Sequence, residues 1–385
     1  MFCIVVAPDS FKGSLAAPEV CAALARGVLR ASPDAQVVAC PMADGGEGTL
    51  DAVLAAVGGA GKRHHLSVCG AAGSAIDAAY GILGAPEGAT AVLEAAQVVG
   101  ITDAEGMRAP VGLRTTRGIG ELVRALLDQG VRRFMVGLGG SSTNDGGAGM
   151  LEALGLSLRD ATGCEIAPGP EGLATLARVD ASALDPRLAS CAITIMSDVN
   201  NPLSGERGAT AIFGPQKGVT PAQIDSFDDA LARFGALAET ELGRHAAGAP
   251  GAGAAGGLGF ALQLLGGKFH SGAEVVADLI GLDAALASAD WAITGEGRSD
   301  LQTLLRKAPF VVAERARARA VPVTLISGAV DPDALPELGK HFAGCFGLAN
   351  GPSSLDECIA NAAAMLVDRA EQIARMLIAA RSRQR

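Results

Sequence analysis

Short hydrophobic runs along the chain alternate with segments whose apolar positions recur at helical spacing. The runs lie at 3–7, 36–40, 290–294, 323–327 and 345–348, and the helical patterns lie at 18–31, at 50–57, from about 309 onward, and at 355–380. Buried parallel strands read as continuous apolar runs, whereas surface helices carry one apolar stripe. Both ends of the chain therefore predict strand–loop–helix units, which are typical of an open, doubly wound parallel sheet.

The pattern changes between these two ends. Runs rich in β-forming residues, at 65–69, 75–83 and 90–93, follow one another without a helical segment between them. This predicts an antiparallel or mixed sheet in a second domain. We therefore expect an α/β domain that is discontinuous in sequence, built from residues 1–63 and 287–385, and an inserted mixed α/β domain at 64–286.

A glycine-rich segment, Val136–Met150 (VGLGGSSTNDGGAGM), follows an apolar run and precedes a new helical pattern. Glycine lets the backbone come close to a ligand, and successive free N–H groups before a helix form an anion-binding concavity. A phosphate or a carboxylate would suit this loop. The segment has neither the GK[ST] ending of a phosphate loop nor a strict GxGxxG pattern. Taken alone, a tight connection without a ligand explains it equally well.

Charged residues gather just after the predicted strands or inside glycine-bearing loops. They are Asp9, Lys12, Asp44, Glu47, Asp145, Asp198, Lys217, Glu296, Arg298, Asp300 and Lys307. Loops carry function disproportionately, and phosphoryl transfer from a nucleotide requires cations, backbone amides and carboxylates together. Each residue alone has an ordinary structural explanation, such as an aspartate in a turn. Their joint occurrence favours a phosphoryl-transfer site.

Composition argues against several other functions. The net charge of −10 and the pI of about 5.1 leave no basic surface for a nucleic acid. The eight cysteines form no CxxC pair, which fits a reducing, cytoplasmic compartment. Residues 246–267 carry no charge, but their first half is glycine, alanine and proline, so we expect no membrane span. The N-terminal run lacks a basic segment and predicts a strand instead of a signal peptide.

Other catalytic chemistries lack an anchor in the sequence. The five histidines show no zinc-binding spacing, and no GxSxG elbow is present for a hydrolase triad. Glu94 lies inside a strand-like run, where a buried carboxylate needs a partner. The sequence leaves open whether Glu94 belongs to a site or to a structural pair.

Six segments together resemble the sequence blocks of the bacterial type 1 glycerate kinases. They are Asp9–Ser14, Pro41–Thr49, Gly139–Gly147, Ser197–Leu203, Gly214–Gly218 and Thr294–Asp300. The likeness spans essentially the whole chain, in order. It implies ATP-dependent phosphorylation of D-glycerate to 2-phosphoglycerate with Mg²⁺. It also implies two domains, one of them a flavodoxin-like or Rossmann-like α/β domain built from both chain ends.

Roles for single residues follow from this resemblance as hypotheses. The expected substrate contacts are Asp9, Ser10, Lys12, Glu296, Arg298 and Asp300, with Lys12 and Arg298 on the carboxylate. The expected nucleotide contacts are Gly139, Gly140, Ser141, Ser142, Thr143, Asn144 and Asp145, with Lys217 or Lys307 on the transferred group. Lys12, Asp44 and Asp198 form the expected catalytic set, and Asp198 or Asp44 serves as base or metal anchor. A cleft between the two domains would close on both substrates and exclude water.

Two places depart from the pattern of that family. Val68–Gly73 stands where a Thr-Gly-Pro-Leu-Gly run is more usual, and Arg306 stands where a glycine is common. Two other functions stay open, namely a kinase for another small hydroxy acid and a non-catalytic ligand-binding sensor on the same scaffold. The sequence also leaves open whether the chain forms a homo-oligomer.

Overall fold

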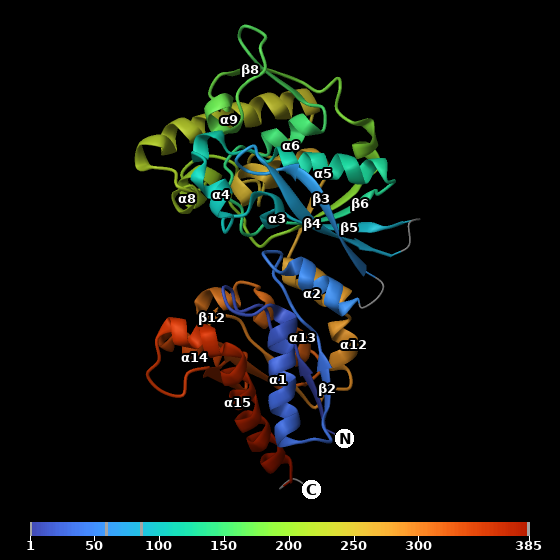
Figure 1. The fold of residues 1–385 in the computed structure, drawn as a ribbon, viewed down its shortest axis with the longest axis vertical. Coiled ribbons are helices and arrows are strands. Elements are labelled where there is room, and N and C mark those ends of the chain that lie inside the picture. Colours follow the sequence, from blue (N-terminus) through green and yellow to red (C-terminus); the bar gives the residue numbers. More distant parts are fainter. Residues whose placement is uncertain (1, 58–60, 85–87, 383–385) are drawn as a thin grey trace. The chain divides into compact units, whose positions relative to one another are not determined.

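The computed structural model describes residues 2–57, 61–84 and 88–382, and the chain divides into two compact units (Figure 1). Unit 1 consists of Met1–Asp44, Asp51–Gly58 and Ser271–Arg385, so it combines both ends of the chain. Unit 2 consists of Gly45–Leu50 and Gly59–His270. The sequence pattern had placed the domain boundaries near 63 and 287.

Unit 1 is built on a five-stranded sheet within the described residues. Its strands are β1 (Cys3–Val6), β2 (Gln36–Ala39), β11 (Trp291–Thr294), β13 (Val323–Ser327) and β15 (Gly344–Gly347). The order is β15-β13-β11-β1-β2, and every neighbouring pair is parallel. This confirms the predicted doubly wound, flavodoxin-like sheet. The strand order reverses between β1 and β11, which is where such sheets bind ligands.

Helices cover both faces of this sheet. Ile4 and Val6 of β1 pack against α1 (Ala17–Ala31) and α15 (Leu355–Ser382), whereas Val5 packs on the face covered by α13 (Ala308–Arg317). The alternation follows from the two-residue period of a strand. The other helices of this part of the chain are α2 (Thr49–Ala56), α11 (Gly272–Leu279), α12 (Leu282–Leu286), α14 (Leu335–Leu338) and the 3₁₀ helices Leu301–Leu304 and Pro332–Ala334. A short parallel pair, β12 (Arg298–Ser299) and β14 (Ala329–Val330), completes unit 1.

Unit 2 is built on a mixed sheet. In spatial order its strands are β10 (Lys268–His270), β9 (Ala192–Met196), β6 (Arg133–Gly137), β5 (Thr90–Glu94), β4 (Ala75–Leu83) and β3 (Gly61–Cys69). The first four are parallel, and β4 runs antiparallel to both β3 and β5. The predicted run of strands without intervening helices therefore forms the antiparallel edge of a mixed sheet.

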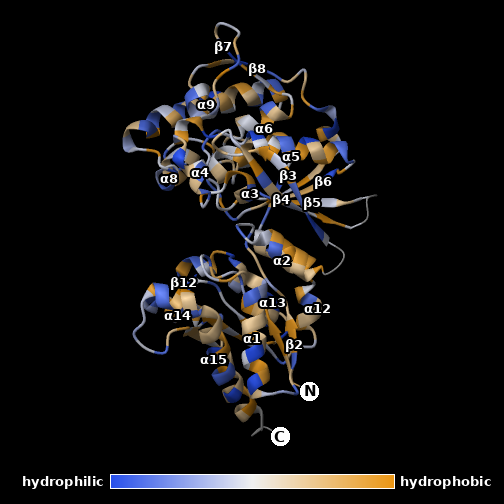
Figure 2. Ribbon diagram, viewed as in Figure 1, coloured by the Kyte–Doolittle hydropathy of each residue, from blue (hydrophilic) through white to orange (hydrophobic). Residues whose placement is uncertain are grey.

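The remaining elements of unit 2 surround this sheet. The helices are α3 (Ala96–Val99), α4 (Ala104–Arg108), α5 (Arg117–Asp128), α6 (Ala148–Ala153), α7 (Gly169–Leu173), α8 (Ala209–Phe213), α9 (Ile224–Leu242), α10 (Leu258–Leu264) and the 3₁₀ helices Val111–Leu113, Pro186–Ser190, Pro215–Lys217, Pro221–Gln223 and Ala254–Gly257. An antiparallel pair, β7 (Ser157–Asp160) and β8 (Leu176–Asp180), was not predicted from the sequence. Helices such as α9 and α15 carry both hydrophobic and hydrophilic residues along their length (Figure 2), as expected for helices with one face on a core.

The uncharged segment at 246–267 is a loop, a 3₁₀ turn and helix α10. Leu258, Phe260 and Leu262 of α10 are buried in the core of unit 2. Over the part of the chain that the structure describes, none of the helices is both long and apolar enough to cross a membrane.

Candidate active site

A cavity of about 800 Å³ lies in unit 1 at the carboxyl ends of β1 and β11, the point where the strand order reverses. We call it the unit 1 cavity. Its charged and hydroxyl-bearing lining includes Asp9, Ser10, Lys12, Asp44, Glu296, Arg298, Asp300 and Lys307. Every predicted substrate contact is therefore in this cavity. Lys307, which the sequence assigned to the nucleotide, lies there as well.

Asp9 follows β1 and is only 5% exposed. Its amide donates to the carbonyl of Gly295 at 2.8 Å, which joins the loops after β1 and β11. Its Oδ1 accepts a hydrogen bond from the Ser10 amide at 2.6 Å. Burial raises the pKa of Asp9 well above its usual range, the neighbouring carboxylates of Asp44 and Glu296 raise it further, and Lys12 opposes the shift.

Glu296 follows β11 and is also buried. Its Oε1 accepts hydrogen bonds from Ser299 Oγ at 3.0 Å and from Thr303 Oγ1 at 2.6 Å. Its Oε2 lies 3.5 Å from Lys307 Nζ. The Ser299 hydroxyl is also hydrogen-bonded to that of Ser327, at the end of β13, at 2.8 Å. Glu296 is therefore held by three residues of the segment between β11 and α13, one of which is supported by Ser327.

Two other predicted substrate contacts, Arg298 and Asp300, also form interactions within unit 1. Arg298 pairs with Asp331 at 3.2 Å, and its side chain is 67% exposed. Asp300 caps the 3₁₀ turn at Leu301–Leu304 by accepting from the Gln302 amide at 2.8 Å. Each still lines the unit 1 cavity.

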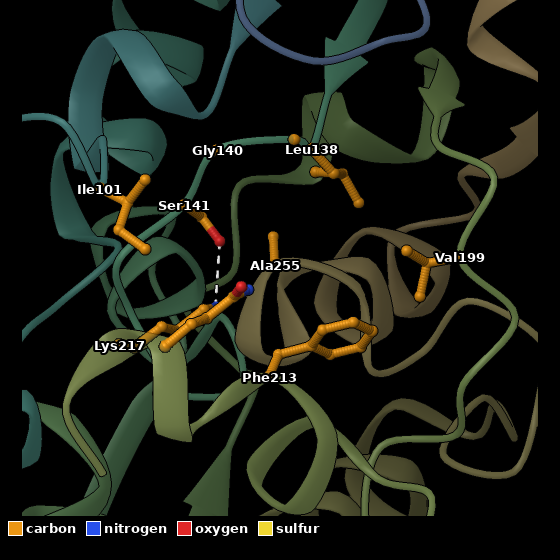
Figure 3. A pocket seen from close by; sticks show the side chains of 10 residues that line it. Ile101, Leu138, Gly140, Ser141, Val199, Phe213, Lys217 and Ala255 are labelled. Carbon is orange, nitrogen blue, oxygen red and sulfur yellow. Dashed lines mark hydrogen bonds between the residues drawn. The ribbon is translucent and has the colours of Figure 1, made fainter. Parts of the chain in front are cut away.

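A second cavity, of about 270 Å³, lies in unit 2, and we call it the unit 2 cavity (Figure 3). Its polar lining consists of Gly139, Gly140, Ser141, Gln216 and Lys217, and its apolar lining of Ile101, Leu138, Val199, Phe213 and Ala255. In Figure 3, Ile101, Ser141 and Lys217 lie on one side of the pocket and Val199 on the other. The first part of the glycine loop and Lys217, which are far apart in sequence, therefore share one cavity.

Lys217 is 2% exposed and lies under the glycine loop. Its Nζ donates to Ser141 Oγ at 3.1 Å and to the Thr143 carbonyl at 2.8 Å. The pKa of Lys217 is lowered to about 7, mainly by burial. The charge of Asp145 opposes this shift, and the charge of Arg114 adds to it. A cation beside backbone amides and a hydroxyl is suited to an anionic group.

The rest of the glycine loop lies behind the unit 2 cavity, outside the set of residues that line it. Ser142, Thr143, Asn144 and Asp145 are all buried. Asp145 accepts from the amide and the hydroxyl of Thr116, both at 2.8 Å, and from the Gly147 amide at 3.0 Å. Buried polar groups need such partners. Ser142 Oγ donates to the Val99 carbonyl at 2.9 Å and Asn144 Nδ2 to Thr210 Oγ1 at 3.0 Å, so these side chains and Asp145 hold the loop in place. Thr143 Oγ1 and Asn144 Oδ1 are buried without a hydrogen-bond partner among the residues that the structure describes.

Arg114 is a residue that the sequence did not single out. Its buried guanidinium donates to the carbonyls of Ser142 at 3.1 Å and Lys217 at 2.9 Å. It therefore fastens the glycine loop to the segment that carries Lys217. No motif or periodicity marks this position, because the role depends on two loops that meet only in the fold.

Asp198 and Asp44, the predicted base or metal anchors, belong to different units. Asp198 is exposed and precedes Val199, which lines the unit 2 cavity, whereas Asp44 lines the unit 1 cavity. Within residues 2–57, 61–84 and 88–382, no three His, Cys, Asp or Glu side chains are grouped as a metal site would require.

Glu94 has the partners that a buried carboxylate needs. Its Oε1 accepts from the Leu50 amide at 2.5 Å, in the first turn of α2, and its Oε2 accepts from Gln97 Nε2 at 3.2 Å. An acidic group at a helix N-terminus is favourable. Glu94 therefore has a structural role at the start of α2.

The two departures from the family pattern lie in turns. Arg306 has a φ of +62°, the left-handed conformation that glycine adopts without strain. Val68–Gly73 covers the end of β3 and the turn into β4, where Gly73 has a φ of +86°.

Comparisons with known proteins agree on one family. Residues 4–378 match the glycerate kinase family. The chain is 41% identical over 360 residues to the glycerate 2-kinase of Escherichia coli K12, covering 93% of each chain. It is 40% identical over 372 residues to the glycerate kinase of Bacillus subtilis 168, covering 96% of each.

A solved structure shows the same fold over nearly the full length. It is a protein of Salmonella typhimurium LT2 described with its crystal structure as a candidate glycerate kinase 2, at 42% identity. The TM-score is 0.85, and the match covers 99% of both chains. This chain therefore belongs to the glycerate kinase family.

Proposed function

We propose that this protein transfers a phosphoryl group from ATP to D-glycerate and forms 2-phosphoglycerate and ADP. One observation carries the proposal: the residues predicted for the acceptor line the unit 1 cavity, and Lys217 with the start of the glycine loop lines the unit 2 cavity. Relatives of near full-length similarity carry the names glycerate kinase and glycerate 2-kinase. The position of the phosphorylated hydroxyl follows those names and the sequence resemblance.

Glycerate fits the chemistry of the unit 1 cavity. The cations there suit its carboxylate, and the hydrophilic loops after β1 and β11 suit its two hydroxyl groups. Asp9 and Asp44 provide carboxylates that could orient the reacting hydroxyl and accept its proton.

The unit 2 cavity suits a nucleotide. Phe213, Val199, Leu138 and Ile101 provide apolar walls for a flat base, and Gly139, Gly140 and Ser141 present backbone amides with little side-chain bulk (Figure 3). Lys217 adds a cation beneath the loop. We assign the phosphates to this loop and to Lys217.

Magnesium fits this donor set as an ion shared with the nucleotide. Mg²⁺ prefers oxygen ligands and is commonly held by one or two carboxylates together with substrate phosphates. The carboxylate that would hold it is Asp198, beside the unit 2 cavity, or Asp44, in the unit 1 cavity. The ion would neutralise phosphate charge during transfer.

Transfer requires the two ligands to meet. The predicted domain cleft would bring them together and exclude water, which limits the hydrolysis of ATP.

The eight cysteines form no disulfide, which supports a reducing compartment such as the cytoplasm.

The test is turnover of purified protein with Mg²⁺, ATP and D-glycerate, followed by ADP release and by phosphorus NMR of the product. A 2-phosphoglycerate signal supports the proposal, and 3-phosphoglycerate would keep the activity but overturn the regiochemistry. Turnover with a different hydroxy acid alone would favour a kinase for that other hydroxy acid. Ligand binding without turnover of any hydroxy acid would favour a sensor.

A further inference from the structure

Lys307 lies in unit 1, as the predicted domain bounds implied, but with the acceptor contacts and not with the nucleotide contacts. It precedes α13 as the N-cap residue, and its side chain lines the unit 1 cavity. The sequence had grouped it with Lys217 as a nucleotide contact. The two lysines belong to different units, and Lys307 lies with the predicted acceptor contacts.

Three cations line the unit 1 cavity, and they differ in how firmly they are placed. Arg298 is 67% exposed and directed to Asp331, and Lys12 is exposed. Lys307 is only 31% exposed. It also stands at the N-terminus of the ten-residue helix α13, whose dipole favours a negative group nearby. Lys307 is therefore the best enclosed of these cations.

Glu296 fixes the ammonium of Lys307. The Ser299 and Thr303 hydroxyls hold one carboxylate oxygen, and the other faces Lys307 Nζ at 3.5 Å. Both hydroxyls come from the segment between β11 and α13, so Glu296 has little freedom to turn away. An ammonium has three protons to donate. One ion pair with Glu296 leaves protons for a ligand.

The charges of the cavity favour a role for such a cation. Asp9, Asp44, Glu296 and Asp300 contribute more carboxylates than there are cations in the lining. An acceptor with a carboxylate would be repelled unless one cation were aimed at it. A neutral acceptor would meet no such barrier.

We propose that Lys307, positioned by Glu296, binds the carboxylate of the acceptor and makes the enzyme select a hydroxy acid over a neutral alcohol of the same shape. Glu296 is a positioning residue in this arrangement. The proposal rests on the proposed function, because it assigns one residue of the same acceptor site.

The experiment compares D-glycerate with its neutral amide, glyceramide, as acceptors. The measured quantity is the ratio of kcat/KM for the two acceptors. Lys307→Met should lower this ratio about 10- to 100-fold, the range expected for losing a hydrogen-bonded charge pair. The KM for ATP should stay near the wild-type value. Lys307→Arg keeps the charge and should retain most of the preference for glycerate.

Glu296→Gln tests the positioning role. Glutamine can still accept from Ser299 and Thr303 but no longer pairs with the ammonium, so the KM for glycerate should rise several-fold. In the double variant with Lys307→Met this effect should disappear, because Glu296 acts only through Lys307. If the effects of Glu296→Gln and Lys307→Met on the KM for glycerate were additive in the double variant, Glu296 would not act through Lys307 and the positioning role would be overturned.

The matched control is Lys340→Met, which removes an exposed lysine paired with Glu337 at 2.7 Å. It should leave the acceptor ratio unchanged. Circular dichroism and the melting temperature would confirm that each variant is folded. If Lys307→Met were unfolded, Lys307→Gln would be measured in its place.

Two results would overturn the proposal. One is an unchanged acceptor ratio in folded Lys307→Met, and the other is a selective rise in the KM for ATP, which would return Lys307 to the nucleotide. Either failure is distinct from failure of the proposed function, which would appear as absent glycerate turnover in the wild-type enzyme.

Discussion

The amine of Lys217 donates a hydrogen bond to the backbone carbonyl of Thr143 at 2.8 Å. A buried amine thus supports the loop whose first residues line the unit 2 cavity. Before a ligand binds, the Lys217 amine has a pKa of about 7 and is therefore mostly neutral at pH 8. The same amine beside a nucleotide phosphate would be charged, because an anion raises the pKa of a neighbouring lysine.

ATP binding should therefore take up a proton at pH 8, where the phosphates themselves are already ionised. The sign follows from the pKa of Lys217, which rises from about 7 in the free protein towards its ordinary value of 10.5 when the anion arrives. Titration calorimetry in buffers of different ionisation enthalpy would measure up to about one proton. In Lys217→Met the uptake should vanish. Equal heats in all buffers for the wild type would refute the assignment.

Asp145→Asn should destabilise the protein by about 2–4 kcal/mol, because buried donors lose a charged acceptor. The carboxylate accepts from Thr116 and from two amides at the start of α6. An amide group would place N–H donors against some of them. Urea denaturation would measure the change in unfolding free energy. Asp333→Asn, at an exposed position, should stay within about 0.5 kcal/mol of wild type.

Gly295→Ala should be far more damaging than Gly297→Ala. A Cβ at Gly295 would collide with the backbone carbonyl of Ile326 in the adjacent strand, which cannot move independently. A Cβ at Gly297 would meet its nearest atom, the Lys12 amide nitrogen, at 3.4 Å. We expect a loss of about 1–3 kcal/mol or more for Gly295→Ala from overpacking. Comparable melting temperatures for the two variants would contradict this explanation.

Ala320→Gly should stabilise the protein by about 0.5–1 kcal/mol. Ala320 follows α13 with a φ of +58°, and a left-handed conformation costs alanine more than glycine loses in chain entropy. Ala318, two residues earlier, has a φ of −59° and provides the opposite case. Ala318→Gly should lower the melting temperature while Ala320→Gly raises it.

Much of the fold follows from the pattern of apolar residues. The run at 323–327 coincides with β13, because a strand buried within a parallel sheet is marked by a largely apolar sequence. The run at 75–83, rich in β-forming residues, coincides with β4. The pair β7 and β8 was missed. Its residues are partly exposed and polar, as in Ser157–Asp160, so no clear period marks it.

The sequence predicted the loops of the candidate site and most members of its two groups of side chains, but not the place of Lys307. Lys307 follows the loop after β11 and falls within the domain predicted for 287–385, but nothing in the sequence shows that its amine pairs with Glu296. Asn144 and Asp145 stay predicted nucleotide contacts. Both are buried in the structure, and burial in a polar loop favours the same side chains as contact with a ligand does. Backbone strain at Arg306 is equally hidden, since φ is a property of the folded chain.

The lining of each cavity by a single unit has an expected kinetic consequence. The residues that line the unit 1 cavity all belong to unit 1, and those that line the unit 2 cavity all belong to unit 2. Neither ligand is needed to complete the surface that receives the other. If the proposed assignment of the two ligands holds, we expect acceptor and nucleotide to enter in either order, so that their concentrations and not an obligatory sequence set the route to the ternary complex.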